Sequence, residues 1–321
     1  MNKILCFGLV CFGSFSINSH AMPLNPHIIQ KSIYMEFFSK KTDSIDLIRK
    51  GVAKNTAVQG LAINNNTSTL YTIHSYGKPQ NAVINRFDYD PTKSTLNALD
   101  TQKPSQFIGH QGITIDQQTN MLWASAGDAI ENKGLNIIGF RYTANNDVIN
   151  PIIIKVFSDD YNKNTYAMPV ITPDHHFLLV RGNKNGTNVV RGYDLNHVSL
   201  DHSQDISQQA SFEWVINKNF YKDKYALQGL ASDGKYIYLM SGGENNQNKR
   251  IQVYDLNGQL LQNLNQVTVG KLDNLFNRKT DGYWEPEGLA IDSKNQKLLI
   301  LFAAGNTKNS IGKLYSISIG N

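Results

Sequence analysis

A five-fold internal repeat constrains the fold of this chain more than any other feature of its sequence. Four segments share a phrase in which Gln or Glu precedes Gly and a short apolar run: Gln59 to Ile63, Gln111 to Ile115, Gln228 to Ser232 and Glu287 to Ile291. A degenerate fifth copy without the Gln-Gly pair runs from Met168 to Thr172. Successive copies lie 52, 57, 60 and 59 residues apart, measured between the markers Gly60, Gly112, Pro169, Gly229 and Gly288. A period of this length indicates one supersecondary unit used five times.

Each copy continues with further strand-like segments. A second apolar run follows each marker after a polar turn: Leu70 to Gly77, Met121 to Gly127, Phe177 to Gly182, Tyr236 to Gly242 and Leu298 to Gly305. A third run, often alternating between apolar and polar residues, comes next: Val83 to Tyr89, Asn136 to Tyr142, Asn188 to Leu195, Arg250 to Leu256 and Lys313 to Ile319. Weaker fourth runs are Pro151 to Phe157 and Ser211 to Ile216. Four antiparallel strands per unit are typical of propeller blades, so we expect an all-β, five-bladed β-propeller.

The last unit indicates how the propeller closes. Its third run ends near Ile319 with no outer strand after it, whereas a strand-like run, Ser32 to Phe38, precedes the first marker. We expect this N-terminal strand to complete blade five, because ring closure hides edges that would otherwise pair with other chains. An open array or a β-sandwich is the alternative, but a sandwich gives turn signals at short spacing and no reason for a period near sixty residues.

The first 21 residues have the pattern of a secretory signal peptide. Lys3 supplies the basic start, Ile4 to Phe15 is apolar, and Ser19 and Ala21 place small residues where a signal peptidase reads them. The apolar run is too short to span a bilayer. We therefore expect cleavage after Ala21, no stable membrane insertion, and a secreted or periplasmic protein with one domain, residues 22–321.

Cysteine content and charge narrow the functional classes. Cys6 and Cys11 both lie in the leader, so the mature chain has no disulfide and no thiolate site. The net charge is +5, and removing Lys3 with the leader leaves +4. The basic residues are scattered, whereas nucleic-acid binding goes with clustered Lys and Arg. We expect a monomer with no nucleic-acid partner.

The ordered set of phrases resembles a known propeller family. The resemblance is carried by Gln59 to Ile63, Tyr71 to His74, Gly109 to Gly112, Leu122 to Gly127, Leu227 to Ala231 and Glu285 to Leu289. It is similar to the β-propeller of receptor-binding proteins of small staphylococcal phages and of teichoic acid biosynthesis protein C, and more distantly to helveticin J-type bacteriocins. The resemblance covers Ser32 to Ile319 and implies recognition of a cell-envelope polysaccharide, wall teichoic acid in the phage case. The chain departs from that pattern by having its own signal peptide, no tail-attachment region, and no Gln-Gly marker in its third repeat.

Propeller symmetry predicts where a binding site lies. The side chains of Gln59, Gln111, Gln228 and Glu287 should converge around the axis at one mouth, because equivalent positions in each blade lie at equal radii. Amides and carboxylates beside aromatic rings suit the hydroxyls and flat faces of sugars. The expected ligand-binding residues are Gln59, His74, His110, Gln111, Trp123, Arg181, Gln228, Trp284 and Glu287, with Tyr76 and Tyr166 as further aromatic candidates. Arg181 is the residue expected to hold an anionic group, since a guanidinium matches phosphate geometry.

Each of these residues also has a structural interpretation. The Gln and Glu side chains can bridge neighbouring blades, Trp123 can pack between blades, and His74 and His110 can be buried structural histidines. For Arg181 the alternative is a surface position.

Catalytic signatures are sparse. The chain has no Gly-x-Ser-x-Gly elbow, no His-Glu-x-x-His helix and no phosphate-cradling loop. Glu285 and Glu287 lie two apart on one expected strand and share a face, so with His110 they form the one acid–base group considered. The same carboxylates would also suit calcium, which prefers oxygen ligands.

The function expected from these features is that of an exported, non-catalytic protein without a cofactor that binds an envelope or surface polysaccharide. Two alternatives remain open. One is a secreted hydrolase or lyase acting on a sugar polymer or ester, and the other is the targeting module of a bacteriocin-like toxin.

Overall fold

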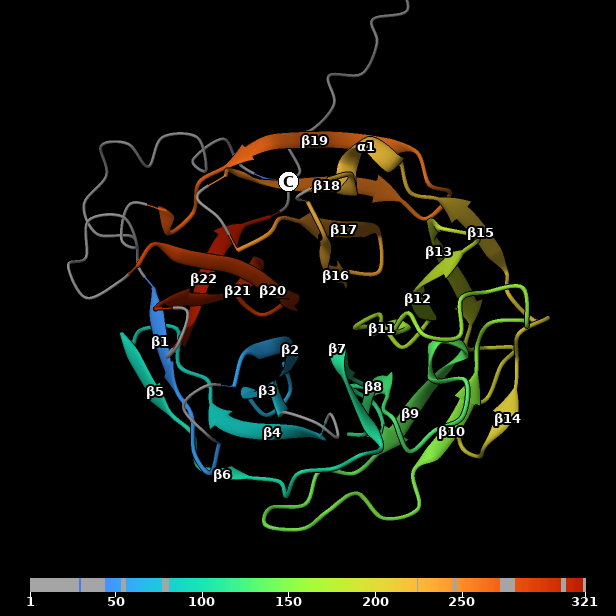
Figure 1. Cartoon of the computed structure of the whole chain (residues 1–321), viewed down its shortest axis with the longest axis horizontal. Helices are drawn as coiled ribbons and strands as arrows, with labels where there is room; N and C mark the ends of the chain where they lie inside the picture. The colour runs from blue at the N-terminus through green and yellow to red at the C-terminus, as the bar shows by residue number, and fades with distance from the viewer. Residues whose placement is uncertain are drawn as a thin grey trace, which may run out of the picture.

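Five β-sheets surround a common axis and form the blades of a propeller (Figure 1). The computed structural model describes residues 29, 44–52, 56–76, 81–223, 225–244, 247–271, 281–306 and 310–319. The leader, residues 1–21, and the run Ser32 to Phe38 lie outside these described residues. Among the described residues, α1 (Lys218–Tyr221) is a short α-helix, η2 (Lys133–Leu135) is a 3-10 turn, and Lys271 is also helical. The expected all-β, five-bladed propeller is confirmed.

The blades take their strands largely in chain order, from the axis outward. Blade 1 contains β2 (Val58–Asn64), β3 (Thr69–Tyr76), β4 (Asn81–Asp88) and β6 (Asp100–Thr101). Blade 2 contains β7 (Ile108–Ile115), β8 (Leu122–Ala126), β9 (Asn136–Phe140), β10 (Ile152–Lys155) and β14 (Gln204–Asp205). Blade 3 contains β11 (Met168–Ile171), β12 (Phe177–Lys184), β13 (Thr187–Asp194) and β15 (Phe212–Val215). Blade 4 contains β16 (Leu227–Ser232), β17 (Tyr236–Ser241), β18 (Lys249–Asp255) and β19 (Leu260–Val267). Blade 5 contains β20 (Tyr283–Asp292), β21 (Lys297–Gly305), β22 (Ile311–Ser318), β1 (Ile45–Ile48) and β5 (Thr95–Asn97).

An N-terminal strand closes the ring, as expected, but the closing strand that the structure describes is β1. It pairs antiparallel with β22, with Ile45 opposite Leu314, and β5 pairs parallel with its other edge. The run Ser32 to Phe38, which was expected to close blade 5, is not among the described residues. Upstream of β1, Ile29 forms a bridge with Ile319, and the side chain of Gln262 in β19 binds both main-chain polar groups of Ile29, at 2.9 and 3.1 Å.

Each seam between neighbouring blades has its own apolar core. Trp123 of blade 2 and Tyr193 of blade 3 lie in one cluster, and Tyr238 of blade 4 and Trp284 of blade 5 lie in another. The three other seams are filled in the same way. The two faces of each sheet therefore serve two different cores, which explains why apolar residues occupy both sides of the inner strands.

The Gln-Gly markers coincide with β-bulges. The pairing of the first and second strands shifts register at Gln59, Gln228 and Glu287, and each bulge is followed by the marker glycine. A Cβ at Gly229 would lie 2.7 Å from Leu289 Cγ on the next blade, so the inner strands approach each other too closely for a side chain. In blade 3, Pro169 pairs regularly with Val180 without a bulge, which accounts for the missing marker.

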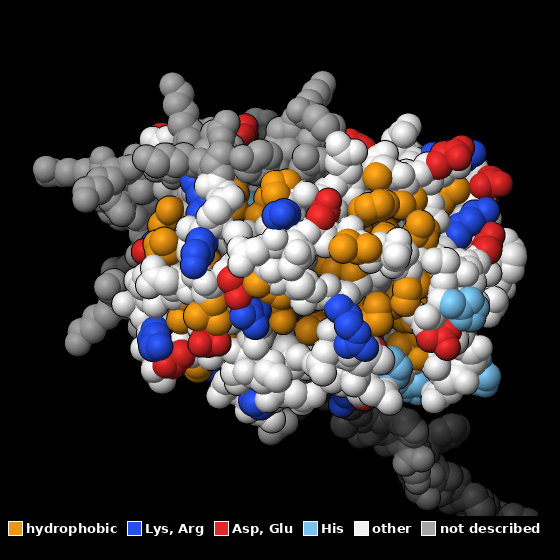
Figure 2. Space-filling model, turned by 90° about the horizontal axis from the view of Figure 1, so that it is seen from below, with side chains coloured by type: hydrophobic (Ala, Val, Ile, Leu, Met, Phe, Trp, Pro, Cys, Tyr) orange, Lys and Arg blue, Asp and Glu red, His pale blue; other side chains and the backbone are white. Residues whose placement is uncertain are grey.

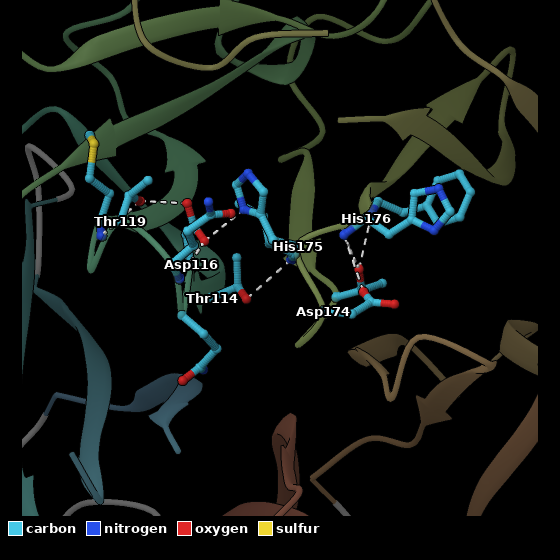
Figure 3. Close-up of polar contacts among 12 residues, drawn as sticks. Thr114, Asp116, Thr119, Asp174, His175 and His176 are labelled. Carbon is cyan, nitrogen blue, oxygen red and sulfur yellow. Dashed lines mark hydrogen bonds and ion pairs between the residues drawn. The ribbon is translucent and has the colours of Figure 1, made fainter. Parts of the chain in front are cut away.

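At the opposite end of the inner strands, a hairpin joins the first and second strands of each blade. These hairpins have similar turns, and side chains in them contact the neighbouring blade. One residue in each hairpin has a positive φ: Ser68, Asn120, His175, Gly234 and Gln296. The side chain of Asn120 accepts a hydrogen bond from Asn64 Nδ2 of blade 1 at 2.8 Å. One repeat later, His175 Nδ1 lies 2.8 Å from Asp116 Oδ1 of blade 2 (Figure 3). The His175–Asp116 pair is thus one of a series of contacts between blades.

Candidate functional site

The four marker side chains meet at the end of the axis where the inner strands begin. Gln59 Nε2 of blade 1 donates to Glu287 Oε1 of blade 5 at 3.2 Å. Gln228 Nε2 of blade 4 donates to Glu285 Oε1 at 2.9 Å, and Gln111 Nε2 of blade 2 donates to Gln228 Oε1 at 3.4 Å. We call these five residues the mouth network. Its hydrogen bonds connect blades 1, 2, 4 and 5, so the predicted convergence and the predicted bridging of blades occur together.

The axis below the mouth network is nearly filled. The space lined by Gly60, Gly112, Gln228 and Glu287 has a volume of about 10 Å³, and the space at the hairpin end has about 40 Å³. A single buried water needs roughly 10–15 Å³ by the same kind of measure. A sugar ring therefore does not fit inside the channel, and a ligand of this size would contact the network from outside the mouth.

Burial raises the pKa values of the two carboxyls in the mouth network. Glu287 is 2% exposed, and desolvation together with the neighbouring Glu285 raises its pKa well above the ordinary value. Desolvation also raises the pKa of Glu285, although Tyr283 donates a hydrogen bond to its Oε2 at 2.8 Å. The carboxyls and the amides of the network together supply hydrogen-bond donors and acceptors at the mouth, which suit hydroxyl groups.

Lys249 is a buried cation beside this network that was not among the expected site residues. Its side chain is fully buried, and desolvation lowers its pKa to about 7. Its Nζ donates to the carbonyl of Gly243 at 2.6 Å and lies 4.4 Å from the ring centroid of Trp284. The alternation of β18 contains a signal for this position, because Lys249 is in phase with the buried Ile251 and Val253.

His110 lies at the same end of the propeller, with different neighbours. Its ring packs edge-on against Tyr166 at a centroid distance of 4.2 Å, and Lys133 Nζ donates to Tyr166 OH at 2.9 Å. Burial and the charge of Lys133 lower the pKa of His110. None of the hydrogen bonds between described residues joins His110 to Glu285 or Glu287, so the considered acid–base group is not assembled as one hydrogen-bonded unit.

Three of the expected ligand-binding side chains lie in the core. Trp123 and Trp284 are 1% and 0% exposed, which leaves no free ring face for a sugar. His74 is 4% exposed, its Nε2 lies 3.0 Å from Thr72 Oγ1, and burial lowers its pKa to about 3. The positions of Trp123 and His74 match the structural interpretation of these two residues, and Trp284 lies in the core as well. The side chain of Tyr76 is outside the described part.

Arg181 has an unusual environment for a buried cation. It is 4% exposed, and desolvation lowers its pKa to about 10. Its Nη1 donates to the carbonyl of Tyr166 at 3.3 Å, whereas its Nε has no hydrogen-bond partner among the described residues. The Nε without a partner is the feature of Arg181 that would favour an anionic group.

Neither a metal-binding cluster nor a membrane-spanning helix occurs in the described part of the chain. No three His, Cys, Asp or Glu side chains gather there in a way that would hold a metal ion. No helix in that part of the chain is long and apolar enough to cross a membrane.

Comparison with known proteins identifies the family of this propeller. A family model described as the phage 5-bladed β-propeller receptor binding platform domain matches residues 57–316. The chain belongs to this family. A search of curated proteins found no match.

Among solved structures, the receptor binding platform of this chain is similar to the tail fiber of Staphylococcus aureus phage P68. The TM-score is 0.61 at 17% identity, over 91% of this chain and 55% of the tail fiber, so this chain spans about half of that protein's length. Two weaker similarities have a TM-score of 0.38 each. Hydrazine synthase of Kuenenia stuttgartiensis is 16% identical, over 77% of this chain and 64% of that chain. TolB from Acinetobacter baumannii is 13% identical, over 83% of this chain and 56% of that chain.

The receptor binding platform thus has two different ends. The mouth network, His110 and Arg181 lie at the end where inner strands begin, and the tight hairpins that latch neighbouring blades lie at the other. At the first end, His110 Nδ1 and Arg181 Nε have no hydrogen-bond partner among the described residues.

Proposed function

We propose that this protein is an exported, non-catalytic binding protein that recognises a cell-envelope or surface polysaccharide, teichoic-acid-like or another glycan, at the mouth of its propeller. Membership of a receptor binding platform family supports a binding role. The observation that carries the proposal is the mouth network, in which amide and carboxyl groups from four blades converge on one surface.

The raised pKa values of the network carboxyls favour a ligand rich in hydroxyl groups. Burial raises the pKa values of Glu285 and Glu287, which lowers the tendency of these groups to carry negative charge. A mouth with less negative charge repels a polymer that also carries phosphates less strongly. Arg181 supports an anionic component, since its guanidinium donates to the carbonyl of Tyr166 while its Nε has no hydrogen-bond partner among the described residues.

Binding to purified polysaccharides tests the proposal. The mature protein from Met22 onward is applied to a glycan array and to immobilised cell-wall polysaccharides, next to Gln228→Ala and Gln111→Ala. Loss of a hydrogen bond at the ligand is expected to weaken binding by about tenfold for each variant. Gln259→Ala is the matched control, because Gln259 lies exposed in the turn after β18, at the hairpin end of blade 4. Failure of the wild-type protein to bind any neutral or anionic polysaccharide would overturn the proposal.

Two further measurements separate this function from its alternatives. No cofactor is proposed, so a chelator should leave binding unchanged, and loss of binding would point instead to calcium at Glu285 and Glu287. Bound polysaccharide should be recovered at its original chain length. Shortened products that disappear with Glu287→Gln would favour a hydrolase or lyase.

Export and oligomeric state belong to the same proposal. A secreted or periplasmic protein cleaved after Ala21 would begin with Met22, and N-terminal sequencing of the exported protein checks this. Light scattering should give the mass of a monomer.

A further inference from the structure

A groove opens on the outer wall of the propeller at the seam between blades 2 and 3. It has a volume of about 590 Å³ and adjoins a second hollow of about 440 Å³, and Met121, Arg141 and Ile152 line both. Figure 2 shows hydrophobic side chains gathered over this part of the outer wall, with histidines beside them. Asp116, Thr119 and His175 also line the groove, so it lies toward the hairpin end, away from the mouth network. We call the two hollows together the wall groove.

The floor of the wall groove is aliphatic. Met121, Ile152, Leu195 and Leu200 are partly buried and pack on the core between blades 2 and 3. Ile149, at the second hollow, is 76% exposed. The core of this seam is therefore open to water, and covering it with an apolar group would be favourable. The lining includes the rings of Trp123 and Phe140, which are 1% and 4% exposed, so neither offers the exposed flat face that a sugar stacks on.

Arg141 lies where the two hollows adjoin, and Asp116, Asp147 and Asp201 are the acidic residues of the lining. Arg141 Nη1 donates to the carbonyl of Thr119 at 3.0 Å, and no carboxylate among the described residues pairs with it. Other charged side chains along the first hollow have partners, since Asp116 pairs with His175 and Asp201 pairs with His202. In the second hollow, the carboxylate of Asp147 accepts a hydrogen bond from the N–H of Val148.

We propose that the wall groove binds an amphiphile that has one linear aliphatic chain and one anionic head, a carboxylate or phosphate ester. The chain lies on the aliphatic floor, and the head pairs with the guanidinium of Arg141. Each of the two hollows has a volume within the range of ordinary small-molecule sites, roughly 300–1,000 Å³. This site is separate from the glycan mouth and does not depend on it.

Calorimetry with three probes tests the ligand chemistry. Dodecyl phosphate below its micellar concentration is expected to bind one-to-one. Dodecyltrimethylammonium, which has the same chain with a cationic head, and inorganic phosphate alone should each bind at least about tenfold more weakly. Equal binding of the two dodecyl compounds, or no binding of dodecyl phosphate, would overturn the proposal.

Substitutions in the wall groove test whether the ligand binds there. Arg141→Gln is expected to weaken dodecyl phosphate binding by about tenfold or more, whereas Lys222→Gln, the same charge change at an exposed site on another blade, should leave it unchanged. Ile149→Asp tests the chain without disturbing the fold, because this side chain is exposed. It should weaken dodecyl phosphate but not hexyl phosphate. Unchanged affinities in both Arg141→Gln and Ile149→Asp would rule out the wall groove.

Two further experiments distinguish the source of the ligand and separate the wall groove from the polysaccharide site at the mouth. Co-sedimentation with vesicles of phosphatidylglycerol supports a membrane lipid as the source, and binding of free dodecyl phosphate without co-sedimentation supports a free amphiphile. Gln228→Ala should retain dodecyl phosphate binding, and Arg141→Gln should retain polysaccharide binding. Joint loss of both activities in either variant would contradict two separate sites.

Discussion

Glu287 and His74 are buried titratable residues whose effects on stability oppose each other. The pKa of Glu287 is raised in the folded protein, so the folded state holds a proton that the unfolded chain loses above its ordinary carboxyl pKa. Its contribution to stability is therefore lost as pH rises. The pKa of His74 is lowered to about 3, so the folded state excludes a proton that the unfolded chain takes up near pH 6.5. Its contribution is present above pH 6.5 and is lost as pH falls.

The effect of Glu287→Gln on the free energy of unfolding should depend on pH, because the pKa of Glu287 is raised in the folded protein. At pH 7.5 the substitution is expected to raise the free energy of unfolding by about 1–2 kcal/mol, because an amide can accept from Gln59 Nε2 without needing a proton. At pH 4, where the unfolded carboxyl is also mostly protonated, the two proteins should agree within about 0.5 kcal/mol. Urea unfolding at the two pH values measures both differences. A gain of equal size at both would contradict a raised pKa.

The sequence located the mouth network but not the environment of every residue in it. Gln59, Gln111, Gln228 and Glu287 were placed correctly because a repeat puts equivalent positions at equivalent radii. Trp123, Trp284 and His74 are in the core, since the burial of a side chain depends on which face of a blade meets its neighbour. Periodicity within one strand does not settle that when both faces are covered.

At the scale of single elements, β1 joins the two ends of the propeller. Leu47 is 4% exposed and lies in the core between blades 5 and 1, whereas the next residue, Ile48, is 41% exposed. The antiparallel pairing with β22 supplies the backbone partners that blade 5 would otherwise lack on that edge. This short strand therefore contributes both packing and edge protection.

Alanine substitutions in β1 test its role in closure. Leu47→Ala is expected to lower the free energy of unfolding by about 2–5 kcal/mol, because it empties a buried site. Ile48→Ala, the control on the same strand, should cost less than about 1 kcal/mol, because its side chain is partly in water. Denaturant titrations of the two variants give the comparison. If Leu47→Ala cost no more than Ile48→Ala, β1 would not be a packed strand of blade 5.

Most strands were predictable, and the closing strand was not located. The second and third runs of each repeat match β3, β8, β12, β17 and β21 and then β4, β9, β13, β18 and β22, because apolar alternation and turn residues mark them locally. The closing strand has only four residues, Ile45–Ile48, and its pairing depends on a partner more than 260 residues away. Such a short segment carries little local signal.

At the scale of the whole molecule, the described blades share their cores in a closed circle. Each of the five seams has an apolar cluster to which two neighbouring blades contribute. No blade can lose its structure without exposing two of these clusters to water. Stability is therefore distributed around the ring rather than held in independent units.

This arrangement predicts a single unfolding transition. The tryptophans lie in blades 2, 3 and 5, so their fluorescence reports on particular blades, whereas far-UV circular dichroism reports on all the sheets. The two signals are expected to give the same urea midpoint and the same slope. Transitions that separate would indicate blades that unfold independently, as in an open array.

The contact between Ile29 and Ile319 makes the propeller suited to circular permutation. Positions near the two ends of the described chain lie side by side, clasped from blade 4 by Gln262. A covalent linker across this point would make the backbone continuous, and a new opening at the exposed Asn185–Gly186 turn would create fresh termini in blade 3. The blades would then be synthesised in a different order and would form the same five-bladed propeller.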